Sequence, residues 1–328
     1  MKAIVATKYG TPEVLELREV PKPAPKANEV LIKVYATTVT SGDRRVRSFD
    51  VPRSFWIPAR LTLGLTHPRK AILGMVIAGE VEAVGQGVTR FKPGDQVYAY
   101  DLTRLSAYAE YATLPETSAI AIKPSTVSYE EASALPFGGV TALYFLKKGG
   151  IRSGQRVLIY GASGSVGTAA VQVAKHFGAV VTAVTSGANV GFVKALGADH
   201  VIDYTKEDFT THGETYDIIF DTVGKTSHSG SLKVLKQGGS YLQAAAGPAE
   251  IIRMKRAARR TGTVLVSETA TPTTDLLMEL RSLVDAGKLR AVIDRCYPLE
   301  QMVEAHRHVD QGHKKGNVVV TVRDTGRH

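Results

Sequence analysis

The residues with the clearest chemical potential lie in one stretch, Arg156-Val-Leu-Ile-Tyr-Gly-Ala-Ser-Gly-Ser-Val-Gly167. Apolar residues 157–160 predict a short buried strand, and the apolar residues between Thr168 and Phe177 repeat at the spacing of one helix face. A turn of small residues therefore joins a strand to the N-terminus of a helix. Backbone N–H groups and the helix dipole bind phosphate at such an end, and small residues leave room for the pyrophosphate of a dinucleotide.

The turn departs from the usual G-x-G-x-x-G pattern, because Ala162 stands where the first glycine would be. Gly161, one residue earlier, is expected to supply the conformational freedom that alanine lacks. An ordinary glycine turn of an α/β sheet is the alternative interpretation. The strand and the helix predicted on either side favour dinucleotide binding.

The end of the next predicted strand indicates which dinucleotide binds. An acidic residue there would bind the ribose 2′-hydroxyl of NAD. This chain instead reads Val184-Thr-Ser-Gly-Ala-Asn189, without an acid. Ser186 and Asn189 can donate hydrogen bonds to a 2′-phosphate, so we expect NADPH as the cofactor.

The elements that position this turn fall into two groups. Before Lys123, short strands separated by turns with glycine and proline predict a β-rich domain. After it, a helix begins at the candidate N-cap Ser128, and strands then alternate with helices, which is typical of a doubly wound parallel sheet. The segment after residue 266 is too long for one more strand of that sheet and is expected to return to the first domain. The parallel strands are predicted at residues 157–160, 180–184, 200–202, 218–220, 240–244 and 263–266.

Length and composition indicate a soluble protein of about two domains. The chain has 328 residues, of which 44% are hydrophobic and 22% charged. No apolar run approaches the roughly 18 residues of a membrane span, and the N-terminus reads as a strand rather than a secretory signal, so we expect a cytoplasmic protein without a membrane partner. The single cysteine, Cys296, excludes an intramolecular disulfide and a cysteine-based zinc site.

The formal net charge is +10, and part of it lies in a basic run at residues 253–260. Such a run can bind the phosphates of RNA. A solvated helix face is the commoner meaning of this pattern, and we do not expect a nucleic-acid partner. The same charge can steer an anionic cofactor toward the protein.

Motifs outside the turn extend the comparison over nearly the whole chain. They are Gly94-Asp-Gln-Val97, Ala107-Tyr-Ala-Glu-Tyr111, Ala134-Leu-Pro-Phe-Gly-Gly-Val-Thr-Ala142, Leu196-Gly-Ala-Asp-His-Val-Ile-Asp-Tyr204, Phe220-Asp-Thr-Val-Gly224 and Gly312-His-Lys-Lys-Gly-Asn-Val318. Together with the turn, they resemble the zinc-independent quinone oxidoreductases of the medium-chain dehydrogenase/reductase superfamily. The resemblance implies a GroES-like catalytic domain at residues 1–122 and 267–328, a Rossmann NADP-binding domain at residues 123–266, a cofactor in the cleft between them, and a homodimer.

The resemblance also bears on metal binding. Zinc-dependent members of the superfamily have a cysteine ligand and a Gly-His-Glu motif where this chain has Ser41 and Gly74-Met75-Val76. A methionine thioether and a valine are not catalytic zinc ligands, so we expect no metal. Without a Lewis acid to stabilise an alkoxide, a quinone or an α,β-unsaturated carbonyl suits the site better than a simple alcohol.

The resemblance assigns cofactor contacts to individual residues, and packing or capping is the alternative role for most of them. Many relatives have a basic residue where Ala188 stands, and Lys194 is a candidate replacement. The residues implied for the pyrophosphate are Ser163, Gly164, Ser165 and Val166. Those implied for the 2′-phosphate are Ser186, Asn189 and Tyr204. Those implied near the nicotinamide, or elsewhere on the cofactor, are Thr141, Val223, Ala245, Val266 and Asn317.

The substrate side is less defined. Asp43 stands where family members have a polar motif beside the cleft, and Thr40 replaces an asparagine that is common there. Asp43 can equally be a cap in a loop. The long segment at residues 49–73 contains Phe55 and Trp56, which would either wall an aromatic substrate or pack the domain.

The leading hypothesis is a zinc-independent enzyme that transfers hydride from NADPH to a quinone or an α,β-unsaturated carbonyl. A reductase of simple ketones or aldehydes is one alternative. The other is a protein that binds NADPH without turnover and uses its basic run to bind RNA. Turnover of a small panel of carbonyl compounds would separate these hypotheses.

Overall fold

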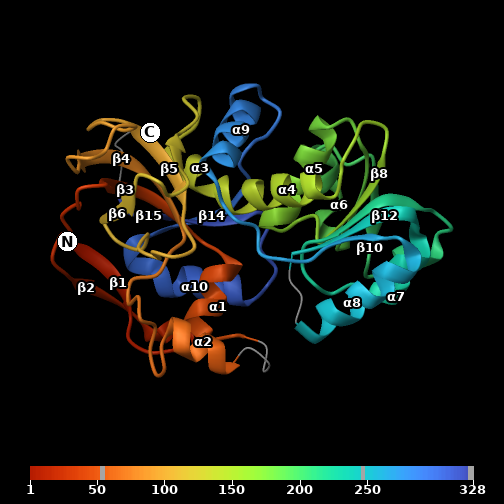
Figure 1. Ribbon diagram of the computed structural model, residues 1–328, viewed down its shortest axis with the longest axis horizontal. Coiled ribbons are helices and arrows are strands. Elements are labelled where there is room, and N and C mark those ends of the chain that lie inside the picture. Colours follow the sequence, from red (N-terminus) through yellow and green to blue (C-terminus); the bar gives the residue numbers. More distant parts are fainter. Residues whose placement is uncertain (52–55, 245–247, 324–328) are drawn as a thin grey trace. The chain divides into compact units, whose positions relative to one another are not determined.

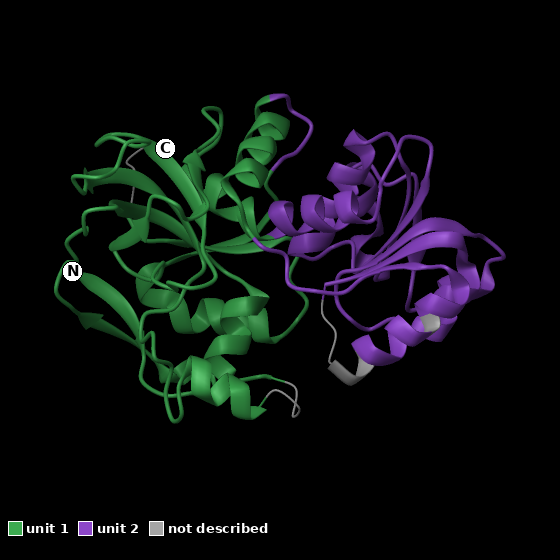
Figure 2. Cartoon of the chain, in the orientation of Figure 1, with its two compact units in different colours: residues 1–137, 272–285, 291–328 green, residues 138–271, 286–290 purple. Residues whose placement is uncertain are grey.

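The computed structural model describes residues 1–51, 56–244 and 248–323 (Figure 1). The chain divides into two compact units, coloured separately in Figure 2. The first comprises residues 1–137, 272–285 and 291–328, and the second comprises residues 138–271 and 286–290. The boundaries of the catalytic and cofactor-binding domains, expected after residues 122 and 266, stay a prediction.

The first unit is built on a mostly antiparallel sheet, completed by two strands from the C-terminal part of the chain that pair with each other in parallel. Its order is β14-β15-β3-β4-β5-β7, with β6 paired to β3, and β1 and β2 form a separate two-stranded sheet. Val318 of β15 pairs with Val39 of β3, so strands far apart in the sequence are neighbours here. The strands are β1 (Lys2–Ala6), β2 (Leu15–Glu19), β3 (Glu29–Val39), β4 (Val76–Val84), β5 (Gln96–Tyr100), β6 (Tyr111–Pro115), β7 (Ile120–Ile122), β14 (Ile293–Pro298) and β15 (Asn317–Thr321).

Helices and two apolar cores support this sheet. One core packs residues such as Tyr108 and Met302 against β15, and the other fills the interior beside β3 and β4. The predicted cap Ser128 is confirmed: its hydroxyl accepts the Glu131 N–H, and the Glu131 carboxylate accepts the Ser128 N–H. The segment 49–73 contains a helix, α2, which was not predicted because the apolar residues there do not repeat at helical spacing. The helices are α1 (Ser41–Ser48), α2 (Trp56–Leu63), α3 (Tyr129–Ala134), α9 (Thr274–Asp285) and α10 (Met302–Asp310), with 3-10 helices η1 (Pro12–Val14) and η5 (Leu299–Gln301).

The second unit is a parallel sheet of six strands in the order β10-β9-β8-β11-β12-β13. This is the strand order of the doubly wound dinucleotide-binding fold, in which ligands bind past the carboxyl ends of the strands where the order reverses. The predicted fold class, a β-rich part with a six-stranded Rossmann sheet, is confirmed. The strands are β8 (Arg156–Tyr160), β9 (Val180–Thr185), β10 (His200–Asp203), β11 (Tyr216–Asp221), β12 (Leu235–Gln243) and β13 (Val264–Val266).

Helices cover this sheet on both faces, with α5 on one side and α7 and α8 on the other (Figure 1). Burial of both faces explains why central strands such as β8 are nearly uniformly apolar. The basic run lies on α8, where Met254 is buried and the neighbouring arginines are exposed. The helices are α4 (Pro136–Lys148), α5 (Ser165–His176), α6 (Val190–Ala195), α7 (His228–Val234) and α8 (Pro248–Thr261), with 3-10 helices η3 (Gly187–Asn189) and η4 (Phe209–Thr211). Within the described ranges, every helix is too short or too polar to cross a bilayer.

Candidate functional site

The turn between β8 and α5 requires glycine at Gly161. This residue has φ +79°, a conformation that residues with a side chain rarely adopt. A Cβ atom there would also lie 2.3 Å from Val223 Cγ2 and 2.8 Å from Thr222 Oγ1. Gly161 therefore provides the freedom predicted for it, and Val223, one of the predicted cofactor residues, lies directly beside the turn.

The N-terminus of α5 is shaped to receive an anion. Its N-cap is Gly164, which has no side chain to occupy the first N–H groups, and a Cβ atom there would meet only Gly161 O, at 3.6 Å. Gly167 is packed much more tightly, because a Cβ atom there would lie 2.1 Å from the same carbonyl oxygen. The helix end is thus held close to the strand while the space in front of it stays open, and these residues fit a pyrophosphate.

Two residues that support the turn were not predicted. Gly138 of α4 packs against the start of α5, because a Cβ atom there would lie 2.4 Å from Ser165 O. Asp221, fully buried at the end of β11, accepts hydrogen bonds from the N–H groups of Val223, Gly224 and Thr226 at 2.8–2.9 Å. Two features of the sequence could have indicated them. Glycines 138 and 139 are adjacent, and Asp221 is an acid at the end of an apolar strand.

The loops after β9 and β10 bring together the residues predicted to bind a 2′-phosphate. Asn189 Nδ2 donates to Ser186 Oγ at 3.1 Å. Asn189 is buried, and its Oδ1 has no hydrogen-bond partner among the described residues. The Tyr204 N–H donates to Thr185 O at 3.1 Å, so Tyr204 lies beside the same loop with its side chain half exposed.

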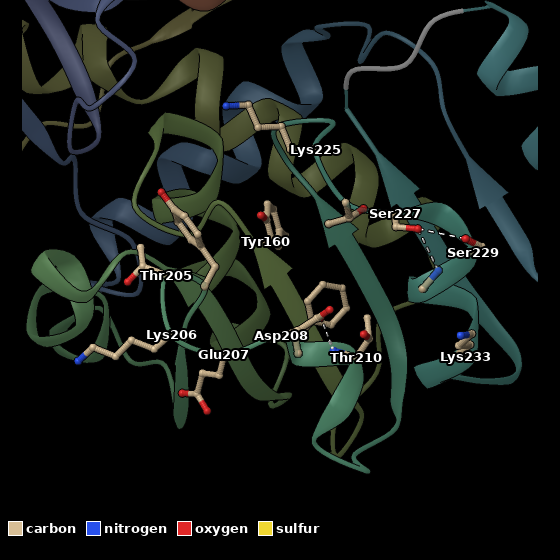
Figure 3. Close-up of a pocket in the computed structure, with 14 residues that line it drawn as sticks. Tyr160, Thr205, Lys206, Glu207, Asp208, Thr210, Lys225, Ser227, Ser229 and Lys233 are labelled. Atoms are coloured by element: carbon tan, nitrogen blue, oxygen red, sulfur yellow. Dashed lines mark hydrogen bonds between the residues drawn. The ribbon is translucent and has the colours of Figure 1, made fainter.

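A pocket of about 620 Å³ opens next to Tyr204 (Figure 3). One wall is aromatic, since the Tyr160 ring lies 6.3 Å from Tyr204 and 6.0 Å from Phe209. The rest of the lining is polar, and includes hydroxyls, three lysines and two acids, Glu207 and Asp208. The lysines outnumber the acids, so the pocket suits a ligand that has both a flat ring and negative charge. The polar residues that line it include Thr205, Thr210, Thr226, Ser227, Lys206, Lys225 and Lys233.

On the first unit, Thr40 and Asp43 form the capping box of α1. The Thr40 hydroxyl and N–H donate to Asp43 Oδ2 at 2.6 and 2.9 Å, and the Asp43 N–H donates back to Thr40 Oγ1 at 3.1 Å. The capping role weighed for Asp43 is therefore confirmed. Burial raises the pKa of Asp43 to about 6, and the hydrogen bonds from Thr40 oppose this rise.

The positions that match zinc ligands in zinc-dependent relatives lie beside this pair. Met75 Sδ is 4.0 Å from Thr40 Oγ1, and a Cβ atom on Gly42 would lie 2.8 Å from the same sulfur. The site thus offers a thioether and a hydroxyl, which are not a zinc donor set. Across the described ranges, no three His, Cys, Asp or Glu side chains gather as a metal site would require.

The remaining predicted residues are distributed over both units. Thr141 is buried on α4, and Val266 is buried at the end of β13. Asn317 begins β15 in the first unit, and its side chain donates to Val292 O at 3.0 Å. Ala245 lies outside the described residues, as does Phe55; Trp56 is half exposed at the start of α2.

Another buried cluster in the first unit gave no signal in the sequence. Arg47, only 2% exposed, donates to Asp310 Oδ2 at 2.7 Å and lies 3.3 Å from His306 Nδ1. Burial, with the charge of Arg47, lowers the pKa of His306 to about 3. The neutral imidazole and the ion pair tie α1 to α10, and so fix the helix that carries Asp43.

The chain is similar to known dehydrogenases and oxidoreductases over nearly its whole length. Residues 26–124 match the family model described as alcohol dehydrogenase GroES-like domain, and residues 196–320 match the one described as zinc-binding dehydrogenase. The chain is 34% identical to the 2-methylene-furan-3-one reductase of Solanum lycopersicum, over 98% of this chain and 79% of that protein. It is 31% identical, with the same shares covered, to the chloroplastic NADPH-dependent alkenal/one oxidoreductase of Arabidopsis thaliana. The solved quinone oxidoreductase of Coxiella burnetii superimposes with a TM-score of 0.88 at 32% identity, over 98% of this chain and 99% of that one.

Proposed function

Because the chain belongs to the zinc-independent quinone oxidoreductase family of the medium-chain dehydrogenase/reductase superfamily, we propose that it transfers hydride from NADPH to a quinone or an α,β-unsaturated carbonyl. The names of the relatives support both halves of this proposal, since one is an NADPH-dependent alkenal/one oxidoreductase and another is a quinone oxidoreductase. The observation that carries the substrate class is Met75 beside Thr40 at the position of the zinc ligands. A conjugated acceptor spreads the incoming negative charge over its own π system, so it needs no metal for this purpose.

The chain's own residues would bind and orient the cofactor. The uncapped start of α5, with Ser163, Gly164, Ser165 and Val166, supports a pyrophosphate site there. Ser186, Asn189 and Tyr204 would contact the 2′-phosphate. The family resemblance places Thr141, Val223 and Val266 near the nicotinamide and implies a cofactor contact for Asn317. NADPH, when bound, supplies the hydride, and positioning the acceptor against it accounts for much of the rate.

Thr40 and Asp43 are the residues we assign to the substrate side. Both side chains are buried, with Thr40 4% and Asp43 1% exposed, and Asp43 would act through its hydrogen bond to Thr40. When Asp43 is ionised, the Thr40 hydroxyl proton is held in the 2.6 Å hydrogen bond. When Asp43 is protonated, it can donate to Thr40, whose own proton is then available to the oxygen of the reduced acceptor. Solvent is the other source of that proton.

The function is tested by following NADPH consumption against a benzoquinone, a naphthoquinone, an alkenal and a simple ketone, with EDTA and with NADH as controls. We expect turnover of a quinone or the alkenal that is unaffected by EDTA and faster with NADPH. Thr40→Val should lower kcat by roughly tenfold to a hundredfold, whereas Thr40→Ser, which keeps the hydroxyl, should retain most of it. Turnover of the ketone alone, lost on adding EDTA, would contradict the proposal.

Two properties of the whole protein belong to the same proposal. We expect a homodimer, supported by the family resemblance and by an exposed edge strand discussed below. The cytoplasmic location expected from the sequence stays a prediction, and one of the relatives named above is chloroplastic.

A further inference from the structure

The loop that follows β9 carries no cation, although it is where a cofactor's 2′-phosphate is expected. It runs through Gly187 and Ala188 to Asn189. Beneath it lies an acid from the neighbouring strand: Asp203, whose side chain is 9% exposed. A Cβ atom on Gly187 would be 2.5 Å from Asp203 Oδ2, so the loop packs directly against this carboxylate. The loop is therefore held down on an anion, which by itself would disfavour a phosphate.

Asp203 is ionised at neutral pH, and its carboxylate is stabilised by hydrogen bonds from Thr205. Its Oδ1 accepts the Thr205 hydroxyl at 2.7 Å and the Thr205 N–H at 3.1 Å. These hydrogen bonds, the Thr205 hydroxyl first, lower the pKa of Asp203 below its usual range. The carboxylate therefore keeps its charge at neutral pH, and a cation must offset it if an anion is to bind above it.

Lys206 is a cation that lies beside Asp203 and the loop after β9. Its Nζ lies 3.9 Å from Asp203 Oδ2, the same atom that approaches Gly187. Its backbone N–H donates to Asp203 O at 3.0 Å, which closes a turn directly after β10. The side chain is 80% exposed, so it can swing from Asp203 to a ligand without losing buried contacts. The adjacent acid, Glu207, lies 3.2 Å from His212 Nε2 and is directed to that partner.

The register of the sheet brings this lysine to the loop after β9. Asp203 pairs with Thr185 in parallel β10 and β9, so the residues that follow them leave the same edge side by side. The other two lysines of the pocket come from farther away. Lys225 and Lys233 follow β11, which is separated from β9 by β8 (Figure 3).

We propose that Lys206 binds the 2′-phosphate of NADPH, so that the charge that selects NADPH in this chain comes from the loop after β10 rather than from the loop after β9. The proposal rests on NADPH being the cofactor, as argued above. Lys194 on α6, considered from the sequence, is the rival candidate.

The test compares two ligands that differ only in the 2′-phosphate, adenosine 2′,5′-bisphosphate and 5′-AMP, by isothermal titration calorimetry. In the wild type we expect the bisphosphate to bind more tightly. Lys206→Gln should weaken the bisphosphate by about tenfold or more, as expected for a lost charge-assisted contact, and leave 5′-AMP unchanged. Lys206→Arg should retain the difference. Lys236→Gln is the matched control, since it removes one lysine charge from the same unit outside the pocket, and it should change neither affinity. Lys194→Gln and Lys225→Gln test two rival cations, and each should keep the preference for the bisphosphate.

Two results would overturn the proposal. One is a wild type that binds the two ligands equally, and the other is loss of the bisphosphate preference in Lys194→Gln or Lys225→Gln but not in Lys206→Gln. Because the readout is binding, it is independent of turnover. A protein that shows the Lys206 effect but reduces no quinone or enone would retain this inference and lose the proposed reaction.

Discussion

At the scale of single residues, the candidate substrate site is formed by Thr40 and Asp43, which also form a helix cap. Thr40 and Asp43 cap α1 as many threonines and aspartates do. What distinguishes them is complete burial of the carboxyl, which raises the pKa of Asp43 to about 6. An aspartate that caps a helix on the surface stays ionised at neutral pH, whereas Asp43 changes its protonation state near pH 6.

Burial of Asp43 should be visible in the pH dependence of stability. A folded-state pKa above the usual value of 3.8 stabilises the protein at low pH, and this contribution is lost as the pH rises through about 6. Asp43→Asn does not titrate. Between pH 4.5 and 7.5 the mutant should therefore gain about 2 kcal/mol in unfolding free energy relative to the wild type. Urea unfolding of both proteins at the two pH values measures this, and a difference that does not change with pH would show that Asp43 is not perturbed.

At the scale of elements, the turn between β8 and α5 combines one tight contact with one open space. Gly167 is pressed against the carbonyl of Gly161, while Gly164 faces almost nothing. The first contact sets how closely the helix approaches the strand, and the second leaves the helix N-terminus accessible. Both are needed, because an anion binds there only if the N–H groups are in place and uncovered.

Gly167→Ala should therefore destabilise the protein and remove cofactor binding together. The added Cβ would meet Gly161 O at 2.1 Å, a backbone atom that cannot move away cheaply. We expect a loss of about 2 kcal/mol or more and no measurable affinity for NADPH. Gly191→Ala on α6 is the matched control, since nothing lies within 4 Å of its Cβ position. It should be neutral or stabilise by up to about 1 kcal/mol, and equal effects of the two substitutions would contradict the steric argument.

At the scale of the whole molecule, the parallel sheet ends at the edge strand β13, which is a candidate surface for dimerisation. β13 pairs with β12, and no described strand pairs with its other edge. Val264 on this strand is 46% exposed. An uncovered strand edge with an exposed apolar side chain can pair with the same strand of a second copy.

We accordingly expect the protein to migrate at twice its chain mass of 35.2 kDa in size-exclusion chromatography with light scattering. Val264→Lys should shift it toward the monomer, because a charge on the edge disfavours strand pairing. Val180→Lys is the control: Val180 is similarly exposed, at 37%, but begins the interior strand β9. A wild type that is monomeric, or a dimer insensitive to Val264→Lys, would contradict this assignment.

The sequence by itself determined the local features of this protein. Residues 157–160 predicted β8, Ser128 predicted the start of α3, and the small residues after Tyr160 predicted the turn between β8 and α5. Each of these depends on interactions between residues close in the chain, namely periodic burial, capping and turn conformation. The same locality explains why the absence of a zinc donor at Met75 could be recognised, since a ligand's side chain is a property of one residue.

Only the tertiary structure decided which distant residues meet. Val223 touches Gly161, and Lys206 and Gly187 share Asp203, because parallel pairing aligns the ends of strands that lie far apart in the chain. The buried state of Asp43, and with it the raised pKa, likewise depends on how the folded chain encloses it. No periodicity or spacing reports such contacts, since they arise from strand order and register, which set the chemistry of the site after the local elements have formed.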